Sequence, residues 1–469
     1  MTSRRFLACA TLLVASGALL GAIPGGPQQS RPVATATKPV FSLTVDSIMR
    51  GPKLVGYEPT GLRWSADSRE LYFEWRRPPD EEAATWVVGR EGGVPRKLSD
   101  DERKKAPPVA GAWDWARKRV LFVDQGDIVL FDAVARTRQQ VTRTAGVEMS
   151  PRWAREETAV TFVRDNNLFL VPLGTGTIEQ LTDVRPRRPE PRETEAEKFV
   201  KAEEEKLITF TRERAERRKK EEEKRKKDAL PVFEINAPRQ SVQDLQLSPD
   251  NEHVFLMVVD RADGGKQAIV PNYVTESAYT EDIQSRSKVG EPQDRRRIAI
   301  LNVKTGKSVW ADSSFAGKAV SPVEAPSAAP TGGGQAPKPA PDRDVRWSMP
   351  LLSPTGKLAV SWARSSDNKD RWIVALDPES GKARVLDALH DDAWINEGFG
   401  GAAGGWLPDD HTIYFTSEAD GWAHLYTLDA SAPSPKRLQL TTGRFEVTRV
   451  TLSPDRSRFY LVSSEKHPG

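Results

Sequence analysis

The sequence predicts an all-β protein, a β-propeller of four-stranded antiparallel blades that carries one long charged helical insertion. Three observations support this fold class. A short turn motif followed by an apolar strand recurs seven times along the 469 residues. A second strand pair with its own signature follows several of these copies. Where no insertion intervenes, neighbouring copies lie about 40 to 50 residues apart, which is the length of one propeller blade.

The first element along the chain is an expected export signal. Arg4 and Arg5 precede an uncharged apolar run from Phe6 to Ile23, an order that is typical of a secretory signal peptide. We assign residues 1–36 to a signal peptide and disordered leader. The protein is therefore expected to be periplasmic or extracellular, without a membrane anchor after cleavage. An uncleaved anchor helix is the alternative, although about 18 residues is short for a membrane span.

The repeated turn motif predicts the blades, which we place within residues 37–469. Its clearest form is Leu-Ser-Pro-Asp, in which proline presets φ and aspartate bonds back to the backbone to close a hairpin. Each copy therefore predicts a strand, a tight turn and a second strand. The copies are RWSADSRELYFEW from Arg63, WDWARKRVLFV from Trp113, SPRWAREETAVTFV from Ser150, LSPDNEHVFLMVV from Leu247, LSPTGKLAVSW from Leu352, LPDDHTIYFTS from Leu407 and LSPDRSRFYLVSS from Leu452.

A second strand pair completes each predicted blade, with clear copies from Asp127, Asn167, Arg297 and His424. One four-stranded sheet cannot cover both of its faces, so neighbouring blades must stack around an axis. A β-sandwich is the alternative, but sandwiches seldom repeat one turn motif at the same phase seven times. The seventh blade is expected to be truncated after its first strand pair.

Three further segments interrupt the repeats. Residues 192–228 hold 26 charged residues out of 37, which predicts a solvated helix that docks at its start through an apolar stripe including Phe199 and Val200. Residues 321–342 form a Pro/Ala/Gly-rich linker. Residues 398–403 match the glycine fingerprint of dinucleotide sites, but no βαβ unit surrounds them, so we interpret them as a loop between blades.

The insertion from Asn272 to Gly290 is the candidate binding loop, and it falls between the two strand pairs of the fourth blade. Its phenols and carboxylates, together with Arg286, offer contacts to a cationic or peptidic ligand. The alternative is a surface loop whose tyrosines pack on the neighbouring blade. The substrate-binding candidates are Tyr273, Glu276, Tyr279, Glu281 and Asp282.

Composition and missing motifs exclude several functions. Lys and Arg number 69 against 66 Asp and Glu, and this near balance argues against a nucleic-acid-binding protein. Cys9 is the only cysteine and lies in the leader, so the mature chain is expected to contain no disulfide and no cysteine nucleophile. The five histidines show no paired metal-ligand spacing, and no G-x-S-x-G elbow occurs. We expect no catalytic residue, no metal and no cofactor.

The C-terminal part of the sequence resembles a known family. SEADGWAHLYTLD from Ser417, the preceding GWLPDD and the Leu-Ser-Pro-Asp turn from Leu452 are similar to the propeller of dipeptidyl peptidase IV-like members of the prolyl oligopeptidase family. The resemblance covers roughly Gly61 to Gly469. It implies a propeller that filters peptides for an α/β-hydrolase domain with a Ser-Asp-His triad, which is expected after the propeller and is absent from this sequence. The family's Glu-Glu pair for the substrate amine finds no matching context here.

Two functions follow from these observations. In the first, the chain is the substrate-gating propeller of an exported serine peptidase, and peptides reach it as partners of the hydrolase domain. The chain alone is then expected to hydrolyse nothing. In the second, the chain is a non-catalytic, exported, TolB-like propeller that binds a protein or a glycan.

Overall fold

The computed structural model describes residues 43–77, 80, 82–187, 195–207, 214, 216–221, 230, 232–288, 290–317, 344–395 and 404–466. The predicted leader, the linker at 321–342 and the glycine-rich segment at 398–403 lie outside these residues. The chain divides into two units, residues 1–57 and 58–469. In the first unit, helices α1 (Val45–Ile48) and α2 (Pro52–Val55) are described.

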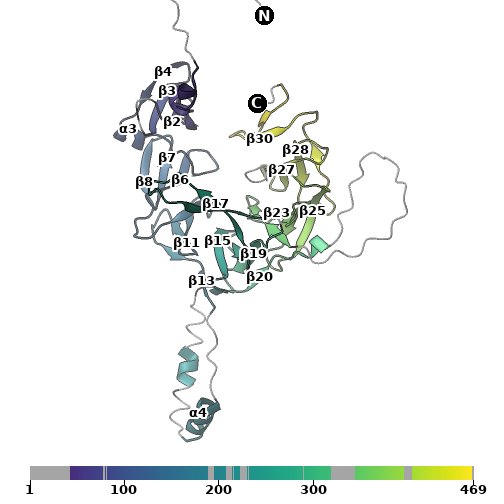
Figure 1. Ribbon diagram of the computed structural model, residues 1–469. Coiled ribbons are helices and arrows are strands. Elements are labelled where there is room, and N and C mark those ends of the chain that lie inside the picture. Colours follow the sequence, from purple (N-terminus) through teal and green to yellow (C-terminus); the bar gives the residue numbers. More distant parts are fainter. Residues whose placement is uncertain are drawn as a thin grey trace, which may run out of the picture. The chain divides into compact units, whose positions relative to one another are not determined.

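The second unit consists mainly of antiparallel sheets that follow one another in chain order, as the colours of Figure 1 show. In the part of the chain that the structure describes, six of them are blades of at least four strands, and a two-stranded hairpin follows the sixth. This arrangement confirms the predicted all-β propeller and its shorter seventh repeat. Among the described strands, no backbone pairing joins the first blade to the final hairpin.

The first blade is β1 (Thr60–Trp64), β2 (Glu70–Trp75), β3 (Ala84–Gly89) and β4 (Gly92–Lys97); the second is β5 (Ala112–Trp113), β6 (Arg119–Asp124), β7 (Asp127–Asp132) and β8 (Thr137–Gln140); the third is β9 (Met149–Ala154), β10 (Ala159–Arg164), β11 (Asn167–Pro172) and β12 (Glu179–Gln180). The fourth is β15 (Gln240–Leu247), β16 (His253–Asp260), β19 (Arg295–Asn302) and β20 (Ser308–Trp310). The fifth is β21 (Val345–Trp347), β22 (Leu351–Leu352), β23 (Ala359–Ser365), β24 (Asp370–Leu376) and β25 (Ala383–His390); the sixth is β26 (Gly404–Trp406), β27 (Thr412–Ser417), β28 (His424–Asp429) and β29 (Leu438–Gln439). The hairpin is β30 (Val447–Leu452) and β31 (Phe459–Ser463).

The repeated turns owe their shape to a buried serine. The Oγ of Ser65, Ser248, Ser353 and Ser453 accepts a hydrogen bond from the backbone N–H five residues later, at 3.0 to 3.2 Å. All four serines are at most 5% exposed. A buried hydroxyl that is satisfied in this way costs little, whereas an unsatisfied backbone N–H would be costly. The Ser-Pro-Asp motif therefore marks the turn between the first two strands of a blade.

The core lies between neighbouring blades, because each sheet presents apolar side chains on both faces. One cluster joins the third and fourth blades through Leu170 and Leu256, and another joins the fourth and fifth through Ile300 and Trp372. Tyr426 belongs to a further cluster between the fifth and sixth blades. This pattern meets the physical requirement of a propeller, in which each blade covers the face of the next.

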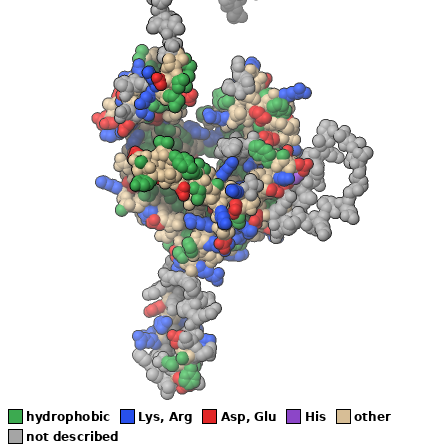
Figure 2. Space-filling view, in the orientation of Figure 1, with side chains coloured by type: hydrophobic (Ala, Val, Ile, Leu, Met, Phe, Trp, Pro, Cys, Tyr) green, Lys and Arg blue, Asp and Glu red, His purple; other side chains and the backbone are tan. Residues whose placement is uncertain are grey.

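Helical segments lie between the blades. Helix α3 (Asp100–Lys104) precedes the second blade, and the 3₁₀ helix η1 (Ser314–Gly317) follows the fourth. Helix α4 (Glu195–Leu207) lies within the charged segment, and the space-filling view shows side chains of both signs there (Figure 2). Phe199 is 68% and Val200 54% exposed. The expected docking of this helix by its apolar stripe is therefore wrong, because those side chains face solvent.

The remaining two sheets are small. Strands β13 (Asp183–Pro186) and β14 (Val232–Ile235) pair in parallel; β13 precedes the charged segment in the sequence, and β14 follows it. Strands β17 (Gln267–Asn272) and β18 (Glu281–Ser287) form an antiparallel hairpin inserted between β16 and β19 of the fourth blade.

Candidate functional site

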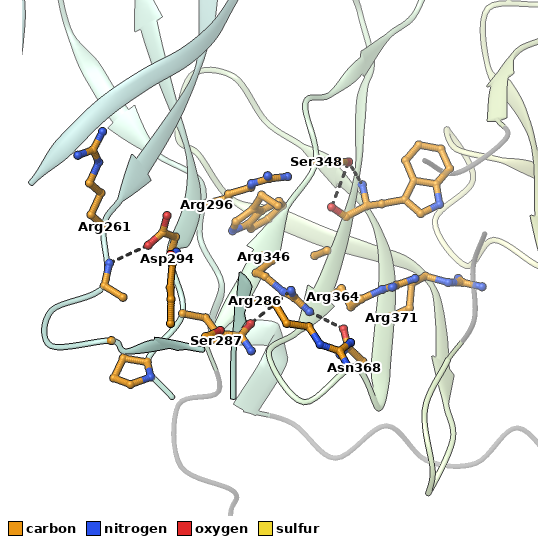
Figure 3. A pocket seen from close by; sticks show the side chains of 18 of the residues that line it. Arg261, Arg286, Ser287, Asp294, Arg296, Arg346, Ser348, Arg364, Asn368 and Arg371 are labelled. Carbon is orange, nitrogen blue, oxygen red and sulfur yellow. Dashed lines mark hydrogen bonds between the residues drawn. The ribbon is translucent and has the colours of Figure 1, made fainter. Parts of the chain in front are cut away.

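A cavity of about 930 Å³ lies between the fourth and fifth blades, and we call it the arginine cavity. On the fourth blade it is lined by the β16–β17 connection, the end of β18 and the residues that lead into β19. On the fifth blade it is lined by β21, β23 and the start of β24. Figure 3 shows the labelled side chains coming from both sides of this space. Its volume is within the range of ligand-binding pockets.

The lining of the arginine cavity is strongly basic. Its cationic residues are Arg261, Lys266, Arg286, Arg296, Arg346, Arg364 and Arg371. Among the described residues, Asp294 is the only carboxylate in the lining, and it accepts a hydrogen bond from the backbone N–H of Ala262 at 2.9 Å. The charge is local, since the whole sequence carries only +3. The fold thus concentrates positive charge that composition alone does not show.

Strand register brings two of these arginines into direct opposition. Arg346 on β21 lies opposite Arg364 on β23 in the antiparallel pair. Like charges opposite each other destabilise a sheet, so this pairing opposes folding. The pKa of Arg346 is lowered by burial, and further by the charges of Arg364 and Arg296. The group stays protonated near neutral pH because the ordinary pKa of arginine is so high.

Arg371 has a different role, because it is only 1% exposed and ion-paired. Its guanidinium contacts the carboxylate of Asp387 and donates to Ser417 Oγ at 2.7 Å. Asp387 also accepts from Arg437 at 2.9 Å. Arg371 therefore holds the fifth blade to the sixth and contributes little free charge to the arginine cavity.

Two tryptophans give the cavity apolar walls. Trp347 is 4% and Trp362 8% exposed, and both belong to the lining. Trp362 Nε1 and Arg346 Nε are buried donors without a hydrogen-bond partner in the described part of the chain. Neither atom is accessible to solvent, so neither is open to a ligand in the cavity.

The residues predicted from sequence lie at the other end of the β17–β18 hairpin. Asn272 pairs with Glu281 and Pro271 with Asp282 near its tip. Tyr273 and Tyr279 are 76% and 79% exposed, so the alternative of tyrosines packed on a neighbouring blade is wrong. Glu276 is exposed as well. None of the five candidates lines the arginine cavity, and their role as a substrate site stays a prediction.

The base of the same hairpin, in contrast, does reach the cavity. Lys266, Gln267, Arg286 and Ser287 all belong to its lining. Sequence reasoning placed Arg286 in the candidate loop but missed the arginines of the fifth blade. The available signal was the repetition of arginines around the middle strands of two consecutive blades, in RADGGK, DRRR, DRDVRW and SWARSSD.

A second cavity, of about 630 Å³, lies among the repeated turns, and we call it the turn cavity. The turns of the third, fourth and fifth blades line it.

The turns of other blades also contact each other. Thr355 donates its backbone N–H to Asp410 at 2.9 Å, which links the turns of the fifth and sixth blades. Arg456, in the turn of the final hairpin, stacks on the ring of Trp115 in the turn of the second blade.

The titratable residues outside these cavities form no metal site. In the ranges that the structure describes, no group of three or more His, Cys, Asp or Glu side chains is placed to hold a metal ion. His253 and His424 are buried and hydrogen-bonded, the former to Glu379 at 2.9 Å. None of the described helices is long and apolar enough to cross a membrane.

Comparison with known proteins assigns the half of the chain that contains the arginine cavity. Residues 241–469 match the family described as the dipeptidyl peptidase IV (DPP IV) N-terminal region. Residues 241–469 are a propeller region of the DPP IV-like kind. This DPP IV-like region holds nearly all of the fourth blade, the fifth and sixth blades, the final hairpin and every residue that lines the cavity.

Solved structures with similar folds include two proteins of the same description. One is Porphyromonas gingivalis dipeptidyl peptidase 4, with 14% identity and a TM-score of 0.47. The other is a Bacteroides ovatus protein assigned as a dipeptidyl aminopeptidase IV, with 13% identity and a TM-score of 0.44. Each match covers 87% of this chain and 50% of the other, so the chain spans about half the length of these proteins. No curated protein sequence matches the chain.

Proposed function

We propose that this peptidase-family propeller admits peptide substrates to an exported serine peptidase of the prolyl oligopeptidase family. The family match over residues 241–469 carries the proposal. The cavity between the fourth and fifth blades supports it, because its volume suits a short peptide but not a folded protein. Hydrolysis itself is assigned to an α/β-hydrolase domain, and the propeller would select what reaches that domain.

Direct binding to the full chain tests this function. Fluorescently labelled, unstructured oligopeptides would be titrated with the protein and followed by anisotropy. A folded protein and a soluble glycan serve as matched competitors. We expect saturable binding of the oligopeptides and no competition by the folded protein or the glycan. Binding of the glycan or the folded protein alone would instead support the alternative of a TolB-like binding propeller.

Export is the second part of the proposal, and it rests on Arg4, Arg5 and the apolar run that follows them. Residues 1–36 would be fused to an alkaline phosphatase that lacks its own signal. We expect phosphatase activity from the fusion and its loss when Leu13→Arg interrupts the apolar run. Equal activity of both fusions would contradict export by this leader.

A further inference from the structure

We propose that the arginine cavity binds acidic peptides, through ion pairs between its unpaired guanidinium groups and several carboxylates of one ligand. This inference rests on the proposed peptide-admitting function and names the class of peptide that the site prefers. Nothing in the family match assigns this charge preference.

Most cations in the lining of the arginine cavity lack an acidic partner in the described part of the chain. Among the described residues, no carboxylate lies within ion-pairing distance of five lining cations, which are Arg261, Lys266, Arg286, Arg296 and Arg364. Within the described ranges, the guanidinium of Arg346 donates only to neutral side-chain amides, those of Asn368 and, at 3.4 Å, Gln293. The arrangement leaves positive charge available for a ligand.

Neighbouring arginines show that this lack of partners is local. Arg295, next to Arg296 on β19, pairs with Asp344 at 2.7 Å. Arg297, on the other side, pairs with Asp260 at 3.5 Å. Neighbouring segments therefore supply carboxylates to the two arginines outside the cavity, whereas no described carboxylate pairs with Arg296, which lines it.

This concentration of positive charge has an energetic cost. The pair formed by Arg346 and Arg364 is held at cross-strand distance in a half-buried setting, where charges are less screened than in water. Such repulsion opposes folding, and an anion between the two guanidinium groups removes it. A site of this kind gains affinity because its donors are already in place.

The side chains of the lining indicate the chemistry of the ligand. Guanidinium groups bind carboxylates and phosphates in a bidentate manner, and the cavity presents them from two blades, so one small anion cannot contact all of them. Trp347 adds apolar surface to the lining. An acidic oligopeptide supplies carboxylates and apolar groups together.

A nucleic acid fits these observations less well. Binding along a nucleic-acid backbone needs a continuous basic surface, whereas the visible face of the protein mixes acidic and basic side chains (Figure 2). The net charge of +3 is also small for such a partner. The cavity therefore favours a short ligand with separated carboxylates.

The test compares two labelled oligopeptides that differ only in charge, alternating glutamate and alanine in one, glutamine and alanine in the other. Binding to the full chain would be measured by anisotropy at about 50 mM and about 300 mM NaCl, which span Debye lengths on either side of the physiological value. We expect the glutamate peptide to bind about tenfold more tightly at low salt, with much of the difference lost at high salt. This comparison needs no variant protein.

Matched variants then locate the site. Arg296→Gln with Arg364→Gln should weaken binding of the glutamate peptide by about tenfold and leave the glutamine peptide unchanged, since each charge-assisted bond contributes substantially. Arg295→Gln removes the same charge one residue away, outside the cavity, and should change affinity less than about twofold. Circular dichroism would verify that the variants are folded.

The outcomes separate the two proposals. Equal affinity for both peptides would overturn the charge preference and leave the peptide-admitting function intact. Binding of neither peptide would overturn both. Binding of inorganic phosphate, measured by isothermal titration calorimetry, without binding of either peptide would show a small-anion site and overturn the assignment to peptides. Equal effects of Arg295→Gln and of the cavity substitutions would place the binding site elsewhere.

Discussion

The turn cavity and the arginine cavity differ in how their charges are satisfied. In the turn cavity, Arg152 pairs with Asp244 at 2.7 Å, and Glu157 lies 3.7 Å from the guanidinium of Arg119. In the arginine cavity, most cations have no acidic partner among the described residues. The ion pairs of the turn cavity therefore hold blades together, whereas the cations of the arginine cavity stay available to bind a ligand.

The largest expected effect tests Arg371, the arginine of the cavity lining that stabilises the fold. Asp387→Asn removes the carboxylate that pairs with buried Arg371 and with Arg437. We expect a loss of about 3 to 5 kcal/mol in the free energy of unfolding, because removing one partner of a buried ion pair is strongly destabilising. Urea unfolding would measure it.

The control for this prediction is Asp344→Asn, which removes the partner of exposed Arg295. We expect a change below about 1 kcal/mol there, as for exposed ion pairs generally. Similar losses for Asp387→Asn and Asp344→Asn would contradict the structural assignment of Arg371.

The next effect tests the repeated turns. Ser353→Ala removes a fully buried hydroxyl that accepts the backbone N–H of Leu358 at 3.2 Å. Leaving that donor unsatisfied should cost about 1 to 3 kcal/mol of unfolding free energy. In Ser457→Ala, an exposed hydroxyl bonded to Asp455 is lost, and the cost should stay below about 0.5 kcal/mol. The two variants would be compared by urea unfolding, and a neutral Ser353→Ala would show that the turn does not depend on its serine.

A smaller effect tests whether the turn contacts reach the final hairpin. Arg456→Ala removes the guanidinium that stacks on the ring of Trp115 and donates to its carbonyl at 3.3 Å. We expect a loss of about 0.5 to 1 kcal/mol in stability, together with a change in tryptophan fluorescence. Arg458→Ala, in the same turn, is the matched control. If both variants have the fluorescence of the parent, the contact between the two turns is absent.

The smallest effect is a pH dependence at the edge of the fifth blade. His390 Nδ1 lies 2.7 Å from Asp370 Oδ1, and this hydrogen bond is the main reason that the pKa of His390 is raised above 6.5. The folded protein thus binds the proton more tightly than the unfolded chain does. The stabilisation is complete below pH 6.5 and is lost as pH rises through the raised pKa of the folded state.

The variant His390→Gln isolates this contribution. The parent should exceed the variant in unfolding free energy by about 0.5 kcal/mol more at pH 5.5 than at pH 8.5, since the pair is partly exposed. Urea titrations at the two pH values would measure the difference. A difference that does not change with pH would contradict the role of the Asp370 contact.

The sequence allowed the fold to be predicted because its information is local. Ser-Pro-Asp and its variants place a proline, a capping carboxylate and a buried serine within a few residues, and they repeat for each blade. Ser248 and Ser453 occupy the same position in their turns and make the same bond. Helix α4 was predicted from its charge pattern, but the docking of Phe199 was not correct, because exposure depends on contacts that no local pattern encodes.

The candidate site was less predictable, since it depends on the register between blades. Arg296 and Arg364 are far apart in sequence and line the same cavity only because the fourth and fifth blades pack against each other. Tyr273 and Tyr279, chosen for their chemistry, lie on an exposed hairpin tip. A pattern of residue types shows what an insertion can bind, but it does not show which end of the insertion meets the cavity.

The parallel pair of β13 and β14 has a consequence for how this protein could have diversified. It joins residues 183–186 to residues 232–235 directly, so the sheet is complete whatever the length of chain between them. Because the entropy of closing a loop grows slowly with its length, relatives could gain or lose residues there at little energetic cost. The same position would accept a reporter domain or an affinity tag without disturbing the blades.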